Sequence, residues 1–305
     1  MADRAISTVV DVSLALLLVS ASVLLVSTQL VGGDADSEQH RADRAAETVA
    51  STTMVTRYSI AAVRSDPTFD TAAVSADASY TRRVHGSPAE LLGSAAVTNA
   101  TFDGGLWATP GRVSPTGPAF EAAVGARLYG RMTDSQSDIR VTALWRPYEN
   151  ASIEGVASAG GYPPLDTDVH SVTMTVPSGM EPVDAGPGAT YDQWGEAIAD
   201  SVVEGYFPAA TTQLTLEQRG LERQMTVSRY RRFETVLGSG ADIAAPTAPG
   251  SPLNRSTADA SAANAELRAE LADRIATELE DTFDSPAEVG EAVRVSEVRI
   301  TVQTW

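Results

Sequence analysis

Two residue types are missing from this chain of 305 residues: it has no cysteine, and all 22 of its basic residues are arginine. The absence of cysteine excludes disulfides, thiolate nucleophiles and thiolate metal sites, and leaves the redox compartment undecided. The absence of lysine excludes Schiff-base catalysis and phosphate loops of the Walker type, because both need a lysine side chain. The composition therefore removes several classes of enzyme before any motif is considered.

Basic residues are also scarce relative to acidic ones. The 22 arginines stand against 40 aspartate and glutamate residues, which gives a formal net charge of −18. This balance argues against nucleic acid as a partner, because binding it requires a surplus of cations that displaces the counterions of the phosphates. Carboxylates stay strongly hydrated at high salt, so the acid excess with arginine in place of lysine predicts a halophilic archaeal source. An ordinary acidic protein from a high-GC genome is the alternative.

One stretch near the start is long and apolar enough to suggest a membrane segment. Residues 6–31 are mostly apolar or small, and Asp11 is their one charged residue. About 20 such residues span a bilayer as a helix, so the sequence predicts a transmembrane helix in contact with membrane lipid. Arg4 precedes the run and acids follow it at positions 34, 36 and 38, which predicts a cytoplasmic N-terminus and an extracellular remainder.

The rest of the chain alternates helical and strand-like patterns. Apolar residues at three- and four-residue steps and capping signals predict helices over 34–63, from 87 onward, over 120–132, over 191–237 with a break at 207–208, and over 257–283. Period-two alternation predicts strands over 72–80, 139–146, 169–176 and 293–305, the last with a bulge at 296–297. Three prolines make 241–257 a flexible linker or loop.

These elements predict an α+β fold class. We expect an N-terminal transmembrane helix followed by an extracellular mixed α/β domain, whose antiparallel or mixed sheet is closed by the last strand. The expected divisions are a possible leader over 1–5, the membrane helix over 6–31, the extracellular domain over 34–240, the linker over 241–257, and a C-terminal helix and strand over 258–305 that pack on the same domain.

The segment Arg4-Ala5-Ile6-Ser7-Thr8-Val9-Val10-Asp11 resembles the class III signal peptide of archaeal type IV pilin-like proteins, in which a short charged leader precedes an apolar helix. The resemblance implies that a prepilin peptidase cuts beside Arg4 or Ala5 and that the chain from Ile6 is kept for packing into a filament core. It also implies that Asp11 pairs with the new amino terminus of a neighbouring subunit. An ordinary signal anchor, with Asp11 near the cytoplasmic interface, is the alternative.

The resemblance extends more loosely over most of the chain. The absence of lysine, the strand Ala-Leu-Trp-Arg-Pro-Tyr at 143–148 and the ending Arg-Ile-Thr-Val-Gln-Thr-Trp resemble uncharacterised haloarchaeal membrane-anchored families. Such families often occur with pilus or secretion-type machinery. The resemblance supplies no established biochemical activity.

Three of the four asparagines head an Asn-x-Ser/Thr sequon, namely Asn99, Asn150 and Asn254. So high a fraction exceeds what the serine and threonine content gives by chance, and it favours an extracellular location. We therefore predict these three side chains as glycosylation sites.

Few residues suggest chemistry. Asp166, Asp168 and His170 alternate, so an extended chain would place three possible divalent-cation ligands on one face. The stronger interpretation is an ordinary acidic loop with His170 at a strand end. No Gly-x-Ser-x-Gly, His-Glu-x-x-His or Gly-x-Gly-x-x-Gly motif occurs, and we predict neither a cofactor nor an enzyme. Arginines on both sides of Tyr230 are interpreted as a solvated helix face paired with Glu222 and Glu234, rather than a docking site for an acidic partner.

The sequence as a whole predicts a non-enzymatic, pilin-like or pseudopilin-like assembly subunit of a haloarchaeal type IV pilus or secretion-type machine. Its partners would be membrane lipid and other subunits of that machine. The alternative is a monomeric, membrane-anchored extracellular module that binds a ligand or acts as a scaffold.

Overall fold

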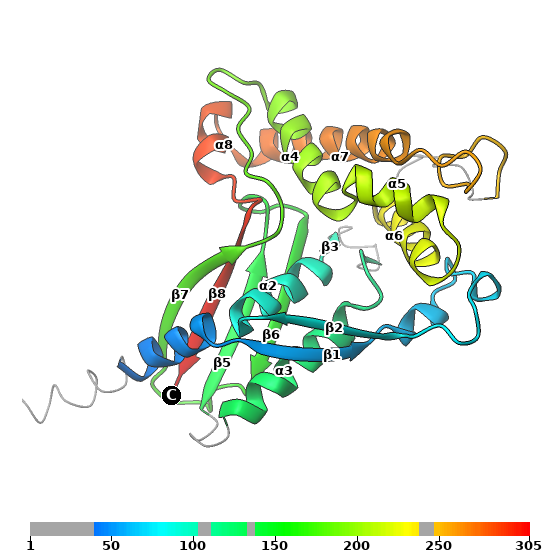
Figure 1. The fold of residues 1–305 in the computed structure, drawn as a ribbon. Helices are drawn as coiled ribbons and strands as arrows, with labels where there is room; N and C mark the ends of the chain where they lie inside the picture. The colour runs from blue at the N-terminus through cyan, green and yellow to red at the C-terminus, as the bar shows by residue number, and fades with distance from the viewer. Residues whose placement is uncertain (1–39, 103–110, 133–137, 238–246) are drawn as a thin grey trace, which may run out of the picture.

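The computed structural model of the chain describes residues 40–102, 111–132, 138–237 and 247–305 (Figure 1). A six-stranded antiparallel sheet with the order β4-β3-β6-β5-β8-β7 forms its centre. The strands are β3 (Thr101–Phe102), β4 (Gly111–Arg112), β5 (Ile139–Trp145), β6 (Ile153–Gly160), β7 (His170–Pro177) and β8 (Glu297–Thr304). A separate hairpin pairs β1 (Met54–Ser59) with β2 (Thr81–Gly86), and two short turns of 3-10 helix, η1 (Ala61–Ser65) and η2 (Thr71–Ala73), lie between them.

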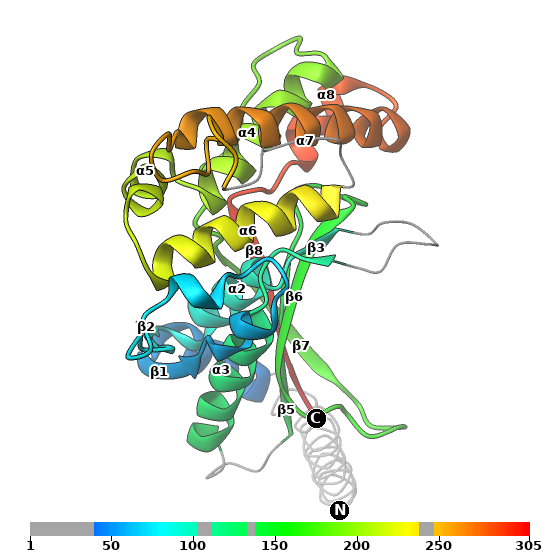
Figure 2. The ribbon, with the colours of Figure 1, turned by 90° about the vertical axis from the view of Figure 1, so that its right-hand side faces the viewer.

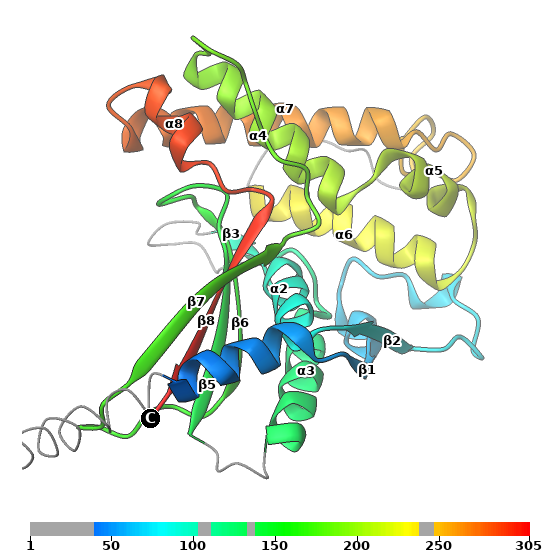
Figure 3. The same ribbon diagram turned by 60° about the vertical axis from the view of Figure 1, so that its left-hand side comes forward.

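The helices form two groups. A helix over residues 40–51, α2 (Pro88–Thr98) and α3 (Gly117–Met132) lie against one face of the sheet, and Figure 3 shows the first of them crossing β8. The second group packs beyond one end of the sheet (Figure 1) and consists of α4 (Tyr191–Tyr206), α5 (Ala209–Glu217), α6 (Leu221–Leu237), α7 (Ala260–Thr282) and α8 (Pro286–Ala292).

Local sequence signals explain where several helices begin. Ser87 caps α2, with its hydroxyl accepting from the amide of Glu90 and the Glu90 carboxylate accepting in return from the amide of Ser87. Pro88 occupies the first turn, where its missing N–H costs nothing. The predicted helix start at residue 87 is therefore confirmed. Phe207 and Pro208 separate α4 from α5, as the predicted break at 207–208 requires.

The last strand of the chain lies inside the sheet. β8 pairs with β5 on one side and with β7 on the other. Its buried residues Val298, Ile300 and Val302 share a face with the buried Val141 and Ala143 of β5. The alternation predicted for both strands is confirmed. The expected bulge at 296–297 is instead the start of the strand, because β8 begins at Glu297.

The helices of the first group approach the sheet closely through glycine. A Cβ atom on Gly155 of β6 would lie 2.1 Å from the carbonyl oxygen of Ala96 in α2. No side chain fits there, so this position fixes the distance between α2 and the sheet.

We expect Gly155→Ala to lower the free energy of unfolding by about 3 kcal/mol or more, because α2 must move away from the sheet. Urea denaturation followed by circular dichroism measures this loss. Gly130→Ala in α3 is the control, since no atom lies within 4 Å of its added Cβ and alanine favours helix. Equal stability of the two variants would show that α2 and β6 are not in close contact.

A cluster of aromatic side chains joins the end helices to the sheet. The ring of Phe207 stacks on Tyr230 of α6 with centroids 3.9 Å apart and meets the edge of Phe233 at 5.4 Å. Tyr206 at the end of α4 contacts both Phe233 and Trp145 of β5. Because these rings come from β5, α4 and α6, the cluster holds the second helix group in a fixed position over the sheet.

The predicted fold class is wrong as stated, because it included a membrane-spanning helix. Within the described residues no helix is both long and apolar enough to cross a membrane. The longest candidate, α7, has 23 residues but carries acids and arginines along its solvent-facing side. The structure supports a mixed α/β fold with antiparallel sheets. The segment 6–31 lies outside the described residues.

Two local predictions also need correction. The helix expected over 34–63 ends at residue 51, and residues 54–59 form β1 instead, where Met54 and Thr56 are buried in alternation. The strand expected over 72–80 is η2 followed by turns, and the strand itself is β2. In both segments the spacing of small residues suggested the wrong type of secondary structure, because alanine, serine and threonine occur in helices, turns and strands alike.

Candidate functional site: the open sheet face

One face of the six-stranded sheet carries no helix within the described residues. Figure 2 shows α2 and α3 on the opposite side of β5 and β6, with the second helix group beyond the end of the sheet. On β7 the exposed residues Ser171, Thr173 and Thr175 alternate with Val172 and Met174, which pack toward the core. We call this surface the open sheet face. It consists of the outward side chains on and beside the four long strands, namely Thr142, Leu144, Arg146, Glu154, Val156, Ser171, Thr173, Thr175, Arg299, Thr301 and Gln303.

A hollow of about 460 Å³ lies at one end of the open sheet face. Arg146 follows β5, Arg294 precedes β8, and Arg299 lies within β8, so three guanidinium groups line it together with Glu149 and Glu297. We call it the arginine hollow. Three cations in one hollow are notable in a chain with a net charge of −18. Guanidinium groups bind carboxylates through paired hydrogen bonds, so the hollow can receive acidic side chains.

The three arginines differ in how far the protein already neutralises them. Arg146 pairs with Glu154 on β6, but its buried Nε has no hydrogen-bond partner among the described residues. Arg294 donates to the carbonyl of Val293 at 2.7 Å. Arg299 is exposed, and its guanidinium group has neither a hydrogen bond nor an ion pair within the described part of the chain. Its charge is therefore free to meet an acidic group from outside.

A polar network beneath the hollow fixes its shape. The buried hydroxyl of Tyr148 donates to Glu278 of α7 at 2.6 Å, and the same carboxylate accepts from the amide of Ser152 and from Arg274, each at 3.0 Å. Burial, and then the charge of Glu278, raise the pKa of Tyr148 far above its usual value, so the hydroxyl stays protonated and donating. The network ties α7 to the turn after β5 and so positions Arg146.

The two sides of the sheet differ in whether their strand edges are covered by other groups. Beyond the short pairing with β3, the edge of β6 is covered by side chains: Asn99 donates to the carbonyl of Val156 at 3.1 Å, and Glu121 accepts from the amide of Ser158 at 2.8 Å. Such contacts block pairing with another strand. The opposite edge is β7, which pairs only with β8 within the described residues.

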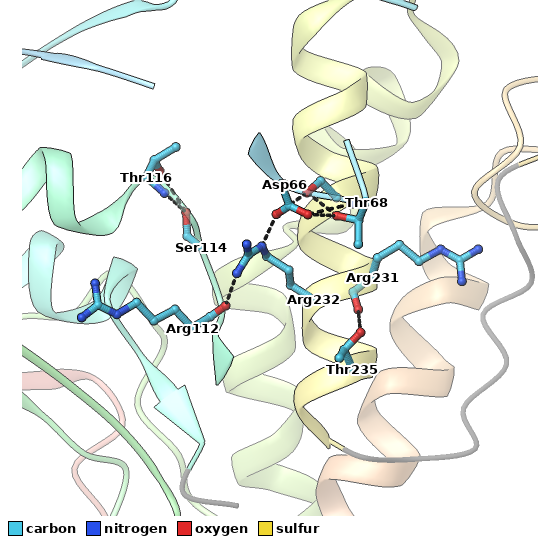
Figure 4. A network of polar contacts seen from close by, with 9 residues as sticks. Asp66, Thr68, Arg112, Ser114, Thr116, Arg231, Arg232 and Thr235 are labelled. Carbon is cyan, nitrogen blue, oxygen red and sulfur yellow. Dashed lines mark hydrogen bonds and ion pairs between the residues drawn. The ribbon is translucent and has the colours of Figure 1, made fainter. Parts of the chain in front are cut away.

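A second polar network, drawn in Figure 4, joins the β1–β2 connection to α6. The buried carboxylate of Asp66 accepts from the amide of Thr68 at 2.8 Å and pairs with Arg232, which also donates to the carbonyl of Arg112 at 3.1 Å. Burial would raise the pKa of Asp66, but the hydrogen bonds from Thr68 and Arg232 outweigh it, so the pKa lies below its usual value. These groups satisfy one another, which indicates a structural role.

The arginines around Tyr230 are engaged inside the chain. Arg231 pairs with Glu234 at 3.1 Å, as predicted for a helix face. Arg232 reaches Asp66, and Arg229 donates to the carbonyl of Tyr206. α6 therefore packs against other parts of the chain on two of its sides, and its arginines do not form a solvated face.

The three predicted glycosylation sites lie in different surroundings. Asn99 is 5% exposed, and its Nδ2, the atom that would carry a glycan, donates to Glu121 and to the carbonyl of Val156. Asn150 is exposed at a turn with φ 61°. Asn254 is half-buried and donates to the carbonyl of Ala248 at 3.3 Å. Asn150 is the side chain that a glycan reaches without breaking a contact.

The remaining predicted site residues are not brought together. Asp166 and Asp168 lie exposed in the loop before β7, and His170 begins that strand opposite Thr304. Within the described residues no group of three histidine, aspartate or glutamate side chains is arranged to hold a metal ion. The processing residues Arg4, Ala5 and Ile6 and the assembly residue Asp11 lie outside the described residues.

Sequence reasoning did not find the arginine hollow, although one signal for it was present. Arg146 and Arg299 fall on the polar phase of strands whose other phase is buried, which places both on one face. What the sequence could not show is that β8 inserts beside β5, because pairing between strands so far apart in the chain is a property of the whole fold.

One family model matches the chain over residues 10–305, and it describes a family of unknown function, DUF7284. The chain belongs to this family. No curated protein and no solved structure matches the DUF7284 chain significantly. The open sheet face and its hollow are thus features of a member of a family whose function is unknown.

Proposed function

We propose that the chain is a non-enzymatic, pilin-like or pseudopilin-like subunit of a cell-surface assembly of the type IV pilus or secretion class. The observation that carries the proposal is the open sheet face, a broad surface of the central sheet with no helix over it in the described residues. A sheet of this size normally has its polar face toward water or toward another molecule. An assembly subunit needs such a surface for its neighbours.

Charge supports the same proposal. Subunits with a net charge of −18 repel one another over most of their surface, so contacts between them are favoured where local cations or uncharged segments lie. The arginine hollow provides such cations on the open sheet face, with the guanidinium group of Arg299 free of partners in the described residues. Acidic side chains of a neighbouring subunit are suitable ligands for it. The pilin-like resemblance of the apolar segment 6–31, with Asp11 within it, supports the same proposal, because such segments make assembly contacts in that family.

The alternative function is a monomeric, surface-anchored binding module. The volume of the arginine hollow, about 460 Å³, favours this alternative, because a hollow of this size accommodates a small acidic ligand. The two proposals place the same residues at the contact. They differ in whether the occupant belongs to another subunit.

Charge reversal in the hollow tests the assembly role. Arg299→Glu should lower incorporation into sheared surface filaments or the isolated machine about tenfold, because losing about 1.4 kcal/mol of contact energy has that effect. The fraction of the chain in the assembly, relative to total chain, is measured by quantitative mass spectrometry. Arg255→Glu is the matched control, since Arg255 is exposed, lies away from the hollow and changes the net charge equally. Unchanged incorporation of Arg299→Glu would contradict the role of the open sheet face.

A further inference from the structure

The free edge of β7 has the hydrogen-bonding pattern needed to pair with itself. The bonds from Asn99 and Glu121 show that Val156 and Ser158 point their backbone groups away from β5. Along antiparallel strands, residues whose backbone N–H and C=O groups bond to the neighbouring strand alternate with residues whose groups point to the other side. The register of β6, β5, β8 and β7 therefore shows, for every residue of these strands, to which side its backbone groups point. Counted across the sheet, the backbone N–H and C=O groups of Ser171, Thr173 and Thr175 point away from β8 to the free edge.

This edge has few of the features that keep strand edges from pairing. Exposed edges are usually blunted by charged side chains, proline, bulges or short length, and here Pro177, at the end of β7, is the one such feature. β7 has 8 residues, pairs without interruption with β8, and contains no acidic residue and no arginine. No charged residue other than His170 occurs between Asp168 and Glu181. The β6 edge of the same sheet, in contrast, is covered by Asn99 and Glu121.

We propose that β7 pairs with β7 of a second copy of this chain, antiparallel about a two-fold axis at Thr173. In this register Thr173 faces Thr173 of the second copy, and Ser171 faces Thr175. Each of these pairs can exchange two backbone hydrogen bonds, and the threonine pairs are favourable across strands. Val172 faces Met174 of the other copy on the half-buried side, so apolar side chains meet there as well.

A second copy is the occupant that the uncharged, self-complementary sequence of β7 favours. Two chains of charge −18 repel each other, and an uncharged edge is where they can approach with least repulsion. Shifting the register by two residues in one direction puts Ser171 opposite Pro177, which has no N–H to donate. With the axis at Thr173, the backbone groups of Ser171, Thr173 and Thr175 all pair with the second copy, and Pro177 lies at the end of the paired segment. The pairing joins two six-stranded sheets into one.

This inference deepens the proposed function by naming one subunit partner, and it rests on that function only for its biological purpose. It is tested on the purified full-length chain, whereas the proposed function is tested by incorporation into the surface assembly. A dimer without incorporation, or incorporation without a dimer, therefore separates the two.

The absence of cysteine allows a disulfide test of the register. Thr173→Cys should give a disulfide-linked dimer under mild oxidation, because the two cysteines face each other within the range that a disulfide spans. Thr175→Cys alone should not, since its copies are about 13 Å apart along the strands. Mixing Ser171→Cys with Thr175→Cys should give the linked heterodimer. Val156→Cys, exposed on β6, is the matched control for random collision.

Sedimentation of the unmodified chain gives the second readout, with a dimer expected. The proposal is overturned if the chain is a monomer, or if Thr173→Cys cross-links no faster than Val156→Cys. It is equally overturned if a dimer forms but only the control cross-links, which would place the contact elsewhere. Slow amide exchange at Ser171, Thr173 and Thr175 in a monomer would show that another part of the same chain covers the edge.

Discussion

Asp66→Asn should lower the free energy of unfolding by about 3 kcal/mol, because it leaves Arg232 partly buried without its counter-charge. The carboxylate also accepts from the backbone and hydroxyl of Thr68, so the β1–β2 connection loses its main tie to α6. Urea denaturation of the full chain measures the loss. Asp70→Asn is the control, since Asp70 is exposed and caps η2, a position that asparagine fills equally well.

The effect of Asp66 should depend on pH in a defined direction. Its pKa in the folded chain lies below its usual value, so the folded state binds the proton less readily than the unfolded state. The ion pair therefore stabilises the fold above the unfolded pKa, about 4, and this contribution is lost as the pH falls through the lower folded pKa. The difference in stability between wild type and Asp66→Asn should shrink in that acidic range. A constant difference between pH 7 and pH 3 would show that the carboxylate acts without its charge.

Phe207→Ala should be the most damaging single change in the aromatic cluster, with a loss of about 3 to 5 kcal/mol in the free energy of unfolding. Phe207 is 1% exposed, and its ring packs on Tyr230 and Phe233. Its carbonyl accepts from Asn264 of α7 at 2.8 Å, so the residue also positions the end helices. Truncation leaves a cavity where α4, α6 and α7 meet.

The expected result is checked by thermal and urea unfolding. Phe207→Leu is the matched variant, because it keeps most of the volume and removes only the ring stacking, so it should lose clearly less than Phe207→Ala. If the two variants are equally stable, or both resemble wild type, the cluster does not hold the second helix group on the sheet.

Much of the fold follows from local patterns in the sequence. The strands β5, β7 and β8 and the helices α3, α4 and α7 were predicted near their observed positions, because apolar residues repeat there with one clear period, and the start of α2 was predicted from its capping residues. Prediction failed where the repeating residues were small, as in the helix expected over 34–63 and the strand over 72–80. Small residues carry little information about which face is buried.

The candidate site was less predictable than the fold. Arg146 and Arg299 are more than 150 residues apart in the chain, and only the insertion of β8 beside β5 puts them in one hollow. The status of Asn99 likewise depends on contacts with Glu121 and Val156 that no sequon reveals. Sequence patterns identify residues that can do chemistry, whereas their partners are set by long-range strand pairing.

The amino terminus of the mature chain tests the assembly proposal most directly. Mass spectrometry of the chain isolated from the cell envelope should show a terminus between Arg4 and Ser7, with the apolar segment retained, because the pilin-like resemblance implies cleavage beside Arg4 or Ala5. In cells without a prepilin peptidase the leader should stay attached. A mature terminus beyond Ser20 would show ordinary secretion, and an uncut chain would show a plain anchor; either result contradicts a pilin-like subunit.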